Sequence, residues 1–316
     1  MTTSFSAQKA FALLLVAVLA TAMLLVGCTP PTPPTPTPPE PEPPNTICSD
    51  GFDTQYCSFY DCFDGTEVDR TKWDFQYGDG SMYGNPGWGN NEQQYYREEN
   101  AYVQDGCLHI VAQKEQFDNK PYTSSKLVTK GLFSQAYGRF EARIRLTKVA
   151  QGLWPAFWMM PQDSVYGGWP YSGEIDIMEL KGRFPNQSSS AIHFGGKPHT
   201  YKYGEIQFEN GVDYTEFHLY SVDWTEEEIY FSVDGVVFAH FTKDQWWSNR
   251  AMDDDNAPFD QEFYMILNFA IGGNFDGGRV PPDDIFPVEL VIDYVRVYPL
   301  ENLPLVDGTE QETPQQ

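Results

Sequence analysis

Strict alternation of apolar and charged residues is the pattern that most limits how this chain can fold. Between Phe140 and Leu146 apolar side chains take every second position, and Glu141, Arg143 and Arg145 take the positions between them. A β-strand places successive side chains on opposite faces, so this run predicts a strand with one apolar face. Helical spacing is scarce elsewhere, whereas glycine and aromatic residues are abundant, at 26 Gly and 16% Phe, Trp and Tyr. This composition predicts an all-β domain.

Four more stretches have the length and composition of strands. Residues 229–233 and 236–241 flank Asp234-Gly235, the dipeptide that a two-residue type I′ hairpin turn favours. Residues 263–271 and 288–298 are two further runs rich in apolar residues. Many short antiparallel strands in a domain of this size predict two packed sheets.

Residues 173–180, Gly-Glu-Ile-Asp-Ile-Met-Glu-Leu, hold three carboxylates among apolar residues. On a regular strand Glu174 and Asp176 would share one face, while Glu179 would fall on the other face and Met178 beside the acids. Burying an unpaired carboxylate costs several kcal/mol. We therefore expect a one-residue bulge near Met178 that returns Glu179 to the acidic face.

A row of acids is most often a solvated strand face, but this strand has no interleaved cation. Four large aromatic residues precede it within about 20 positions: Trp154, Trp158, Trp169 and Tyr171. Like charges held together raise one another's pKa, which suits a site that needs one carboxylate and one carboxylic acid. Two carboxyl groups in those two states are what glycosidases use.

The acidic stretch resembles the signature of glycoside hydrolase family 16. Its extra residue before the last Glu resembles the laminarinase-like (endo-β-1,3-glucanase) branch of that family. Five other segments resemble the same branch, in its order, and the similarity covers roughly residues 55 to 299: they are Gly87–Glu92, Tyr137–Arg143, Trp154–Met159, Trp169-Pro170 and Asp293–Tyr298.

The resemblance implies a β-jelly-roll sandwich of two antiparallel sheets, with the three acids on the floor of a concave cleft. It assigns Glu174 as the nucleophile and Glu179 as the general acid and base, with Asp176 between them holding the charge state of the nucleophile. The implied stereochemical outcome is retention of configuration. No cofactor is implied for catalysis.

Sugar-contacting residues are expected around the acids, because a glucan cleft needs aromatic plates and polar edges. Trp158 and Trp169 are the best candidates for plates. Trp154 is a further candidate that packing in the core would explain equally well, and His193 could be a hydrogen-bonded core residue. The positions that match family contacts to sugars or to the acid are Asn90, Arg139 and His193.

The net charge of the chain limits the kinds of molecule that it can bind. The chain has 45 acidic and 20 basic residues and a formal net charge of −25, which repels nucleic acid and anionic polysaccharides. We expect a neutral β-glucan as the substrate, no nucleic-acid partner, and a monomer.

An endo-β-1,3-glucanase is the first hypothesis for the function. The alternatives are a mixed-linkage glucanase, a galactanase or a transglycosylase of the same family, and a catalytically silent glucan-binding protein, against which the presence of both glutamates argues.

Four cysteines follow Cys28, and four cysteines allow three pairings. Disulfides can form if the protein is exported, as the N-terminal segment described below predicts. Among the pairings, we expect Cys48 with Cys57 and Cys62 with Cys107.

A structural calcium is a further possibility that the resemblance implies. In the family the counterpart of Asp293 often binds calcium together with a glycine carbonyl that matches Gly106, and calcium prefers such oxygen ligands. Backbone N–H groups could satisfy Asp293 instead. Cys62 stands where the branch commonly has Glu, so a Cys62–Cys107 disulfide would replace part of the metal site.

The N-terminal segment of the chain predicts targeting to a membrane. Lys9 precedes an apolar run from Ala10 to Gly27, which ends in Leu25-Val26-Gly27-Cys28. The ending resembles a bacterial lipobox, which implies that residues 1–28 are a lipoprotein signal and that Cys28 carries the lipid. An uncleaved transmembrane helix is the alternative. Either reading predicts an extracytoplasmic protein tethered to the bacterial cell envelope.

Three further segments follow from composition. Residues 29–45 are Pro- and Thr-rich and predict an extended polyproline linker. Residues 46–300 are long enough for one catalytic domain with a large core. Residues 301–316 are polar and predict a disordered tail.

Overall fold

The computed structural model describes residue 51, residues 53–209 and residues 211–303. The chain divides into the units Met1–Pro43 and Pro44–Gln316, and every described residue belongs to the second. The predicted signal with Cys28, the linker, Cys48 and most of the predicted tail lie outside the described residues. The described part holds strands and short 3₁₀ helices without an α-helix, and no helix in it has the length and apolarity to cross a membrane.

The larger of the two main sheets has eight strands in the order β15-β14-β13-β8-β17-β5-β4, with β1 also paired to β17. Its strands are β1 (Phe59–Asp61), β4 (Ala101–Gln104), β5 (Cys107–Ala112), β8 (Gly138–Leu146), β13 (His218–Trp224), β14 (Glu228–Val233), β15 (Val236–Thr242) and β17 (Val288–Tyr298).

The other main sheet has seven strands in the order β12-β11-β10-β9-β16-β7-β2. Its strands are β2 (Asp74–Phe75), β7 (Lys126–Val128), β9 (Leu153–Pro161), β10 (Glu174–Glu179), β11 (Gln187–Phe194), β12 (Thr200–Gln207) and β16 (Phe263–Ile271). A parallel pair, β3 (Gln94–Tyr96) and β6 (Tyr122–Ser124), stands apart from both.

The described residues hold seven 3₁₀ helices. They are η1 (Thr54–Tyr56), η2 (Ser81–Tyr83), η3 (Pro86–Gly89), η4 (Glu98–Asn100), η5 (Lys243–Gln245), η6 (Asp283–Ile285) and η7 (Leu300–Asn302). Five of the seven lie in connections between strands, whereas η1 precedes β1 and η7 follows β17.

The strands expected from the sequence are confirmed. β16 and β17 have the predicted bounds. In β8 the apolar positions from Phe140 to Leu146 are fully buried. β14 and β15 form the predicted hairpin, in which Asp234 and Gly235 have φ of 50° and 78°, as a type I′ turn requires.

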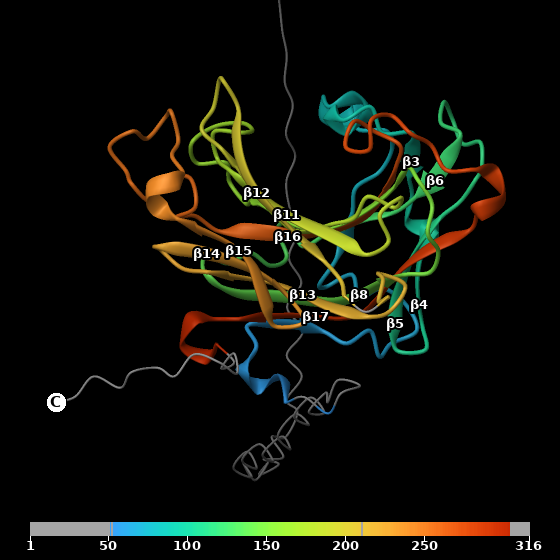
Figure 1. Cartoon of the computed structure of the whole chain (residues 1–316), viewed down its shortest axis with the longest axis horizontal. Coiled ribbons are helices and arrows are strands. Elements are labelled where there is room, and N and C mark those ends of the chain that lie inside the picture. The colour runs from blue at the N-terminus through green and yellow to red at the C-terminus, as the bar shows by residue number, and fades with distance from the viewer. Residues whose placement is uncertain (1–50, 52, 210, 304–316) are drawn as a thin grey trace, which may run out of the picture. The chain divides into compact units, whose positions relative to one another are not determined.

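The hydrophobic core lies between the two main sheets, which Figure 1 shows one above the other, with β11, β12 and β16 above β8, β13 and β17. Trp224 of β13 meets Phe263 of β16 edge to face, with ring centroids 5.3 Å apart. At another contact, a Cβ on Gly204 of β12 would come within 2.5 Å of the Cβ of Ala239 of β15, so only glycine permits this close approach. Two antiparallel sheets packed in this way confirm the predicted jelly-roll sandwich.

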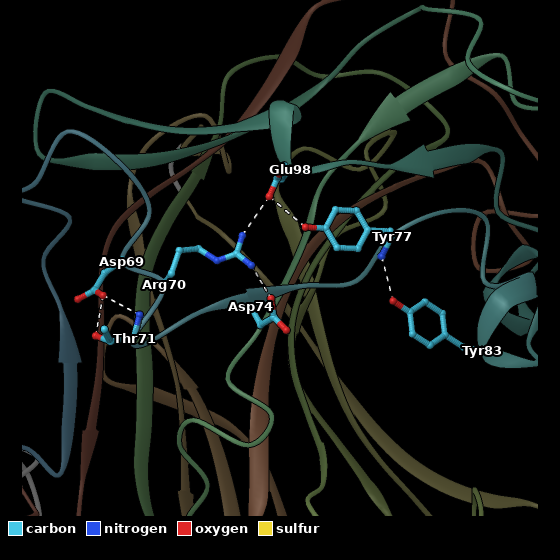
Figure 2. Close-up of polar contacts among 7 residues, drawn as sticks. All are labelled: Asp69, Arg70, Thr71, Asp74, Tyr77, Tyr83 and Glu98. Atoms are coloured by element: carbon cyan, nitrogen blue, oxygen red, sulfur yellow. Dashed lines mark hydrogen bonds and ion pairs between the residues drawn. The ribbon is translucent and has the colours of Figure 1, made fainter.

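A surface network joins the segment around β2 to η4, as Figure 2 shows. Arg70 contacts Asp74 through Nη2 at 2.7 Å and Glu98 through Nη1 at 3.1 Å. The hydroxyl of Tyr77 donates a hydrogen bond to Glu98 at 3.0 Å. The side chains of the three charged residues are about half exposed, so we expect a small contribution to stability.

The predicted disulfide pairings are wrong. Cys57 and Cys107 are free thiols, and Cys62 is disulfide-bonded. Cys107 lies at the start of β5, where burial and the nearby Asp293 raise the pKa of its thiol. Burial also raises the pKa of the Cys57 thiol, to about 11. Each of the three complete pairings would use all four cysteines, and the sequence carried no signal that Cys57 and Cys107 stay free.

Candidate active site

The acidic strand β10 contains the predicted bulge. Against β11, Asp176 pairs with Ala191 and Glu179 with Ser189, so three residues of β10 face two of β11. The register against β9 shifts between Asp176 and Met178 as well. Met178 is fully buried in the core, while Glu179 stays half-buried and accepts a hydrogen bond from Trp154 Nε1 at 3.0 Å. The bulge therefore keeps Glu179 on the face that carries the other two acids.

Glu174 and Asp176 form a compact cluster with His193 of β11. One polar atom from each of the three side chains lies within 4.8 Å of the others. His193 Nε2 is 3.1 Å from Asp176 Oδ2 and 3.8 Å from Glu174 Oε1. The other ring nitrogen of His193 lies 2.8 Å from His199 Nε2. The imidazole thus connects the acids to the neighbouring edge of the sheet.

All three carboxyl groups hold their protons to unusually high pH. Burial is the main cause, and it raises the pKa of each of Glu174, Asp176 and Glu179 to about 8. The charge of Asp176 raises the pKa of both glutamates further, whereas His193 opposes the rise. Each ionisation makes the next one harder, so the row titrates as a coupled group. At intermediate pH, one of the three groups is therefore ionised while its neighbours stay protonated.

Three tryptophans surround the row. Trp158 of β9 stands opposite Asp176 and donates its indole N–H to Asn268 Oδ1 at 2.6 Å. Trp169 is 49% exposed and lies beside Glu174, where its indole N–H lowers the pKa of that carboxyl. Trp154 is half-buried, holds Glu179 and stacks on Phe275 at 4.9 Å. An exposed aromatic ring beside buried acids is suited to holding a sugar ring over the carboxyls.

Sequence and structure comparisons agree with this geometry. Residues 89–266 match the model of glycosyl hydrolases family 16. This chain belongs to glycoside hydrolase family 16. The chain is 44% identical over 255 residues to the glucan endo-1,3-beta-glucosidase A1 of Niallia circulans, a match that covers 75% of this chain and 37% of the relative's length.

Two further similar proteins are covered over most of their length. The beta-glucanase of Rhodothermus marinus is 42% identical over 238 residues, which are 73% of this chain and 80% of the relative. Among solved structures, the laminarinase catalytic domain from Thermotoga maritima MSB8 aligns with a TM-score of 0.68 and 36% identity, over 77% of this chain and 97% of that one. The fold of this glycoside hydrolase is thus the one that laminarinases adopt.

Asn90 lies near the tryptophan side of the family 16 site. A Cβ on Gly273 would fall 3.0 Å from the Trp154 ring and 3.2 Å from the Asn90 carbonyl oxygen. The Asn90 carbonyl also accepts a hydrogen bond from the Asn274 N–H at 2.8 Å. The structure therefore brings the backbone of Asn90 close to Trp154, and a sugar contact through its side chain stays a prediction.

Arg139 does not reach the site, so its predicted sugar contact is corrected. It lies on β8 in the eight-stranded sheet, where the next residue, Phe140, points into the core. Its guanidinium makes two hydrogen bonds to Asp223, at 2.6 and 2.7 Å. Alternation places this pair on the face of the sheet that points away from the core, and thus away from the acids. Its position fits a structural ion pair.

Lys126 is a neighbour of the site that the sequence did not reveal. Its buried ammonium lies over the rings of Trp88 and Trp158, at 4.2 and 4.8 Å from their centroids. Burial lowers the pKa of Lys126 to about 8, against the attraction of Glu92 and Glu174. A lysine between Ser125 and Leu127 gives no signal of burial in a single sequence. Its partners come from three separate segments, around residues 88–92, in β9 and in β10, that only the fold brings together.

The residues around Asp293 fit calcium poorly. The Asp293 carboxylate accepts a hydrogen bond from Arg143 Nη1 at 2.6 Å, so a guanidinium already supplies the positive charge there. Calcium requires six to eight oxygen ligands. Gly106 lies in the turn before β5, and the neighbouring Cys107, which is near enough to Asp293 to be affected by its charge, offers a thiol in place of an oxygen ligand. Within the described ranges, Glu174, Asp176 and His193 are the one group of three potential metal ligands close enough to share an ion.

Proposed function

We propose that this glycoside hydrolase cleaves internal β-1,3-glucosidic bonds of laminarin-type glucans with retention of configuration. The observation that carries the proposal is the bulge in β10, which presents Glu174, Asp176 and Glu179 on one face. Support for the substrate comes from relatives that are named endo-1,3-beta-glucosidase and laminarinase. The net charge of −25 favours a neutral polysaccharide over a sulfated one.

The proposed reaction has two steps. In the first, the ionised Glu174 attacks the anomeric carbon while Glu179 gives its proton to the departing glycosidic oxygen, so that a covalent glycosyl-enzyme forms and one glucan fragment leaves. In the second, Glu179 takes a proton from water, whose oxygen displaces Glu174 from the anomeric carbon. Both residues return to their starting states, and two inversions give net retention.

The surroundings support these roles. Glu174 lies near His193 and Lys126, whose positive charge favours its carboxylate. Glu179 accepts a hydrogen bond from Trp154, and burial and Asp176 raise its pKa as they raise that of Glu174. Because the charge of one glutamate opposes ionisation of the other, the pair can supply one carboxylate and one carboxylic acid.

The test uses the purified protein with laminarin, lichenan, xyloglucan and agarose, and measures reducing ends, product lengths and anomeric configuration. We expect rapid hydrolysis of laminarin to internal fragments with β-configured products. Glu174→Gln is expected to lose roughly 10³-fold or more in kcat, with its melting temperature retained. Activity confined to agarose, or full activity in the Gln variant, would contradict the proposal. Preferential cleavage of lichenan would instead indicate a mixed-linkage glucanase.

We also propose that the enzyme is tethered to the bacterial cell envelope through a lipid on Cys28. The support is the sequence alone, an apolar run ending in Leu25-Val26-Gly27-Cys28 and followed by the Pro-rich segment 29–45. Expression of the full chain with a radiolabelled fatty acid tests it. Label is expected in the membrane fraction of the natural chain and absent from Cys28→Ala, and equal labelling of both would refute the anchor.

A further inference from the structure

We propose that Tyr201 and Tyr203, on the edge strand β12, form an additional sugar-binding surface that continues the acidic site toward one edge of the seven-stranded sheet. Its ligand would be a glucose ring of the same neutral β-glucan chain. The inference rests on the proposed function, because it extends that substrate beyond the residues that hold the reacting bond.

The two tyrosines point away from the core. Along β12 the odd-numbered residues are exposed, and the Tyr201 and Tyr203 side chains rank among the most accessible aromatics, at 54% and 59%. The even-numbered residues face the other sheet, where Gly204 meets Ala239 and Ile206 packs against the core. Because strand side chains alternate, both tyrosines lie on the face that carries the acids.

The strand register places the tyrosines in line with the acids. Tyr201 pairs with His193, and His193 pairs with Glu174 on the next strand. In the adjacent row, Tyr203 pairs with Ala191, which in turn pairs with Asp176. Two strand spacings, about 10 Å, therefore separate Tyr201 from Glu174 at the backbone. This distance is longer than one sugar ring spans, so the tyrosines would contact a ring other than the one being cleaved.

Aromatic rings in contact with one another extend from the acids to the edge of the sheet. We call this surface the aromatic strip, and it consists of Trp169, His193, His199, Tyr201 and Tyr203. Tyr201 stacks on both histidines, with ring centroids 5.7 Å apart in each case. Trp169 lies 4.6 Å from His199, and Tyr203 lies 6.1 Å from Tyr201. The strip begins at Trp169 beside Glu174 and ends at β12, the edge strand of the sheet.

Polar groups lie beside the strip. A small hollow next to the general acid is lined by Glu179, Lys181, Gln187, Ser188, Ser189 and Glu205. Glu205 is on β12 and shares its exposed face with the two tyrosines. A pyranose ring has a flat face of C–H bonds and an edge of hydroxyl groups. Exposed aromatic faces flanked by carboxylates and hydroxyls match both parts of that surface.

The experiment compares Tyr201→Ala, Tyr203→Ala and the double variant with the corresponding Phe variants. KM and kcat are measured on laminarin, and binding to laminarin is measured in the Glu174→Gln background by affinity electrophoresis. Each Ala substitution is expected to weaken binding and raise KM by roughly two- to tenfold, with a smaller change in kcat. The Phe variants keep the ring and are expected to retain most of the binding.

Tyr102 provides a matched control. It is an exposed tyrosine that stacks on a histidine, His109, at 4.7 Å, but it lies on β4 in the other sheet. Tyr102→Ala is expected to leave KM unchanged. Unaltered KM and binding in the Tyr201→Ala, Tyr203→Ala double variant would overturn the inference, and so would an equal loss in Tyr102→Ala. Failure of the unaltered enzyme to cleave laminarin would instead refute the proposed function, so the two failures are distinguishable.

Discussion

Asp176 is the residue that controls the protonation of its two neighbours. It lies between Glu174 and Glu179 in the row, and its charge raises the pKa of both. Glu179 must be protonated to act as the acid, so activity is lost as the pH rises through its pKa. A negative charge at Asp176 moves that loss to higher pH, because it opposes ionisation of Glu179.

Asp176→Asn removes this charge and keeps the shape of the side chain. We expect the alkaline limb of the kcat profile to move to lower pH by about one pH unit, together with a loss of maximal activity. The measurement is kcat on laminarin from pH 4 to 10, with Ser190→Ala, a buried neighbour on β11, as the control. An alkaline limb that stays in place would show that Asp176 does not set the pKa of the acid.

The Arg–Asp ion pairs of Arg139 and Arg70 differ in their burial and in the elements that they join. Arg139 and Asp223 join β8 to β13 through two short hydrogen bonds and are largely buried. Arg70 joins its partners Asp74 and Glu98 on the surface, where all three side chains are about half exposed (Figure 2). Buried charges left without a partner destabilise a fold far more than exposed ones do.

Chemical denaturation of Arg139→Ala and Arg70→Ala measures this difference. We expect Arg139→Ala to lower the free energy of unfolding by about 3 kcal/mol, because Asp223 loses its partner, and Arg70→Ala to lower it by less than about 1 kcal/mol. In the folded Arg139→Ala variant, KM for laminarin is expected to be unchanged. A large rise in KM at near-normal stability would show that Arg139 contacts the sugar.

The predictability of each element depended on whether its pattern was local. Alternation in β8 and the Asp234-Gly235 turn are short-range signals, and both predicted the structure. The bulge was predictable too, because the alternative was a buried, unpaired Glu179. Lys126 was not, since its burial depends on Trp88 and Trp158 from other segments. The disulfide of Cys62 and the outward position of Arg139 depended on tertiary neighbours in the same way.

At the scale of the whole molecule, the poor fit of the residues around Asp293 to calcium predicts a stability that does not depend on this ion. Arg143 already neutralises Asp293 at the end of the β5 and β17 pair. We therefore expect dialysis against EDTA to leave the melting temperature and the activity unchanged within error, and added calcium to raise neither. A melting temperature that falls in EDTA and recovers with calcium, but not with magnesium, would show that a structural calcium site exists.

Because β10 contains a bulge, the number of residues between its acids does not by itself fix the side of the sheet to which each acid points. Ile177 and Met178 both point into the core, so the strand contains one position more than its polar face uses. Removing Met178 would restore plain alternation and still leave Glu174, Asp176 and Glu179 projecting to the same side. Hydrolysis of laminarin by the deletion variant would demonstrate this. The same chemistry can then be encoded by acidic motifs of unequal length, and homologous enzymes are better compared by the direction of their carboxyl groups than by the number of residues between them.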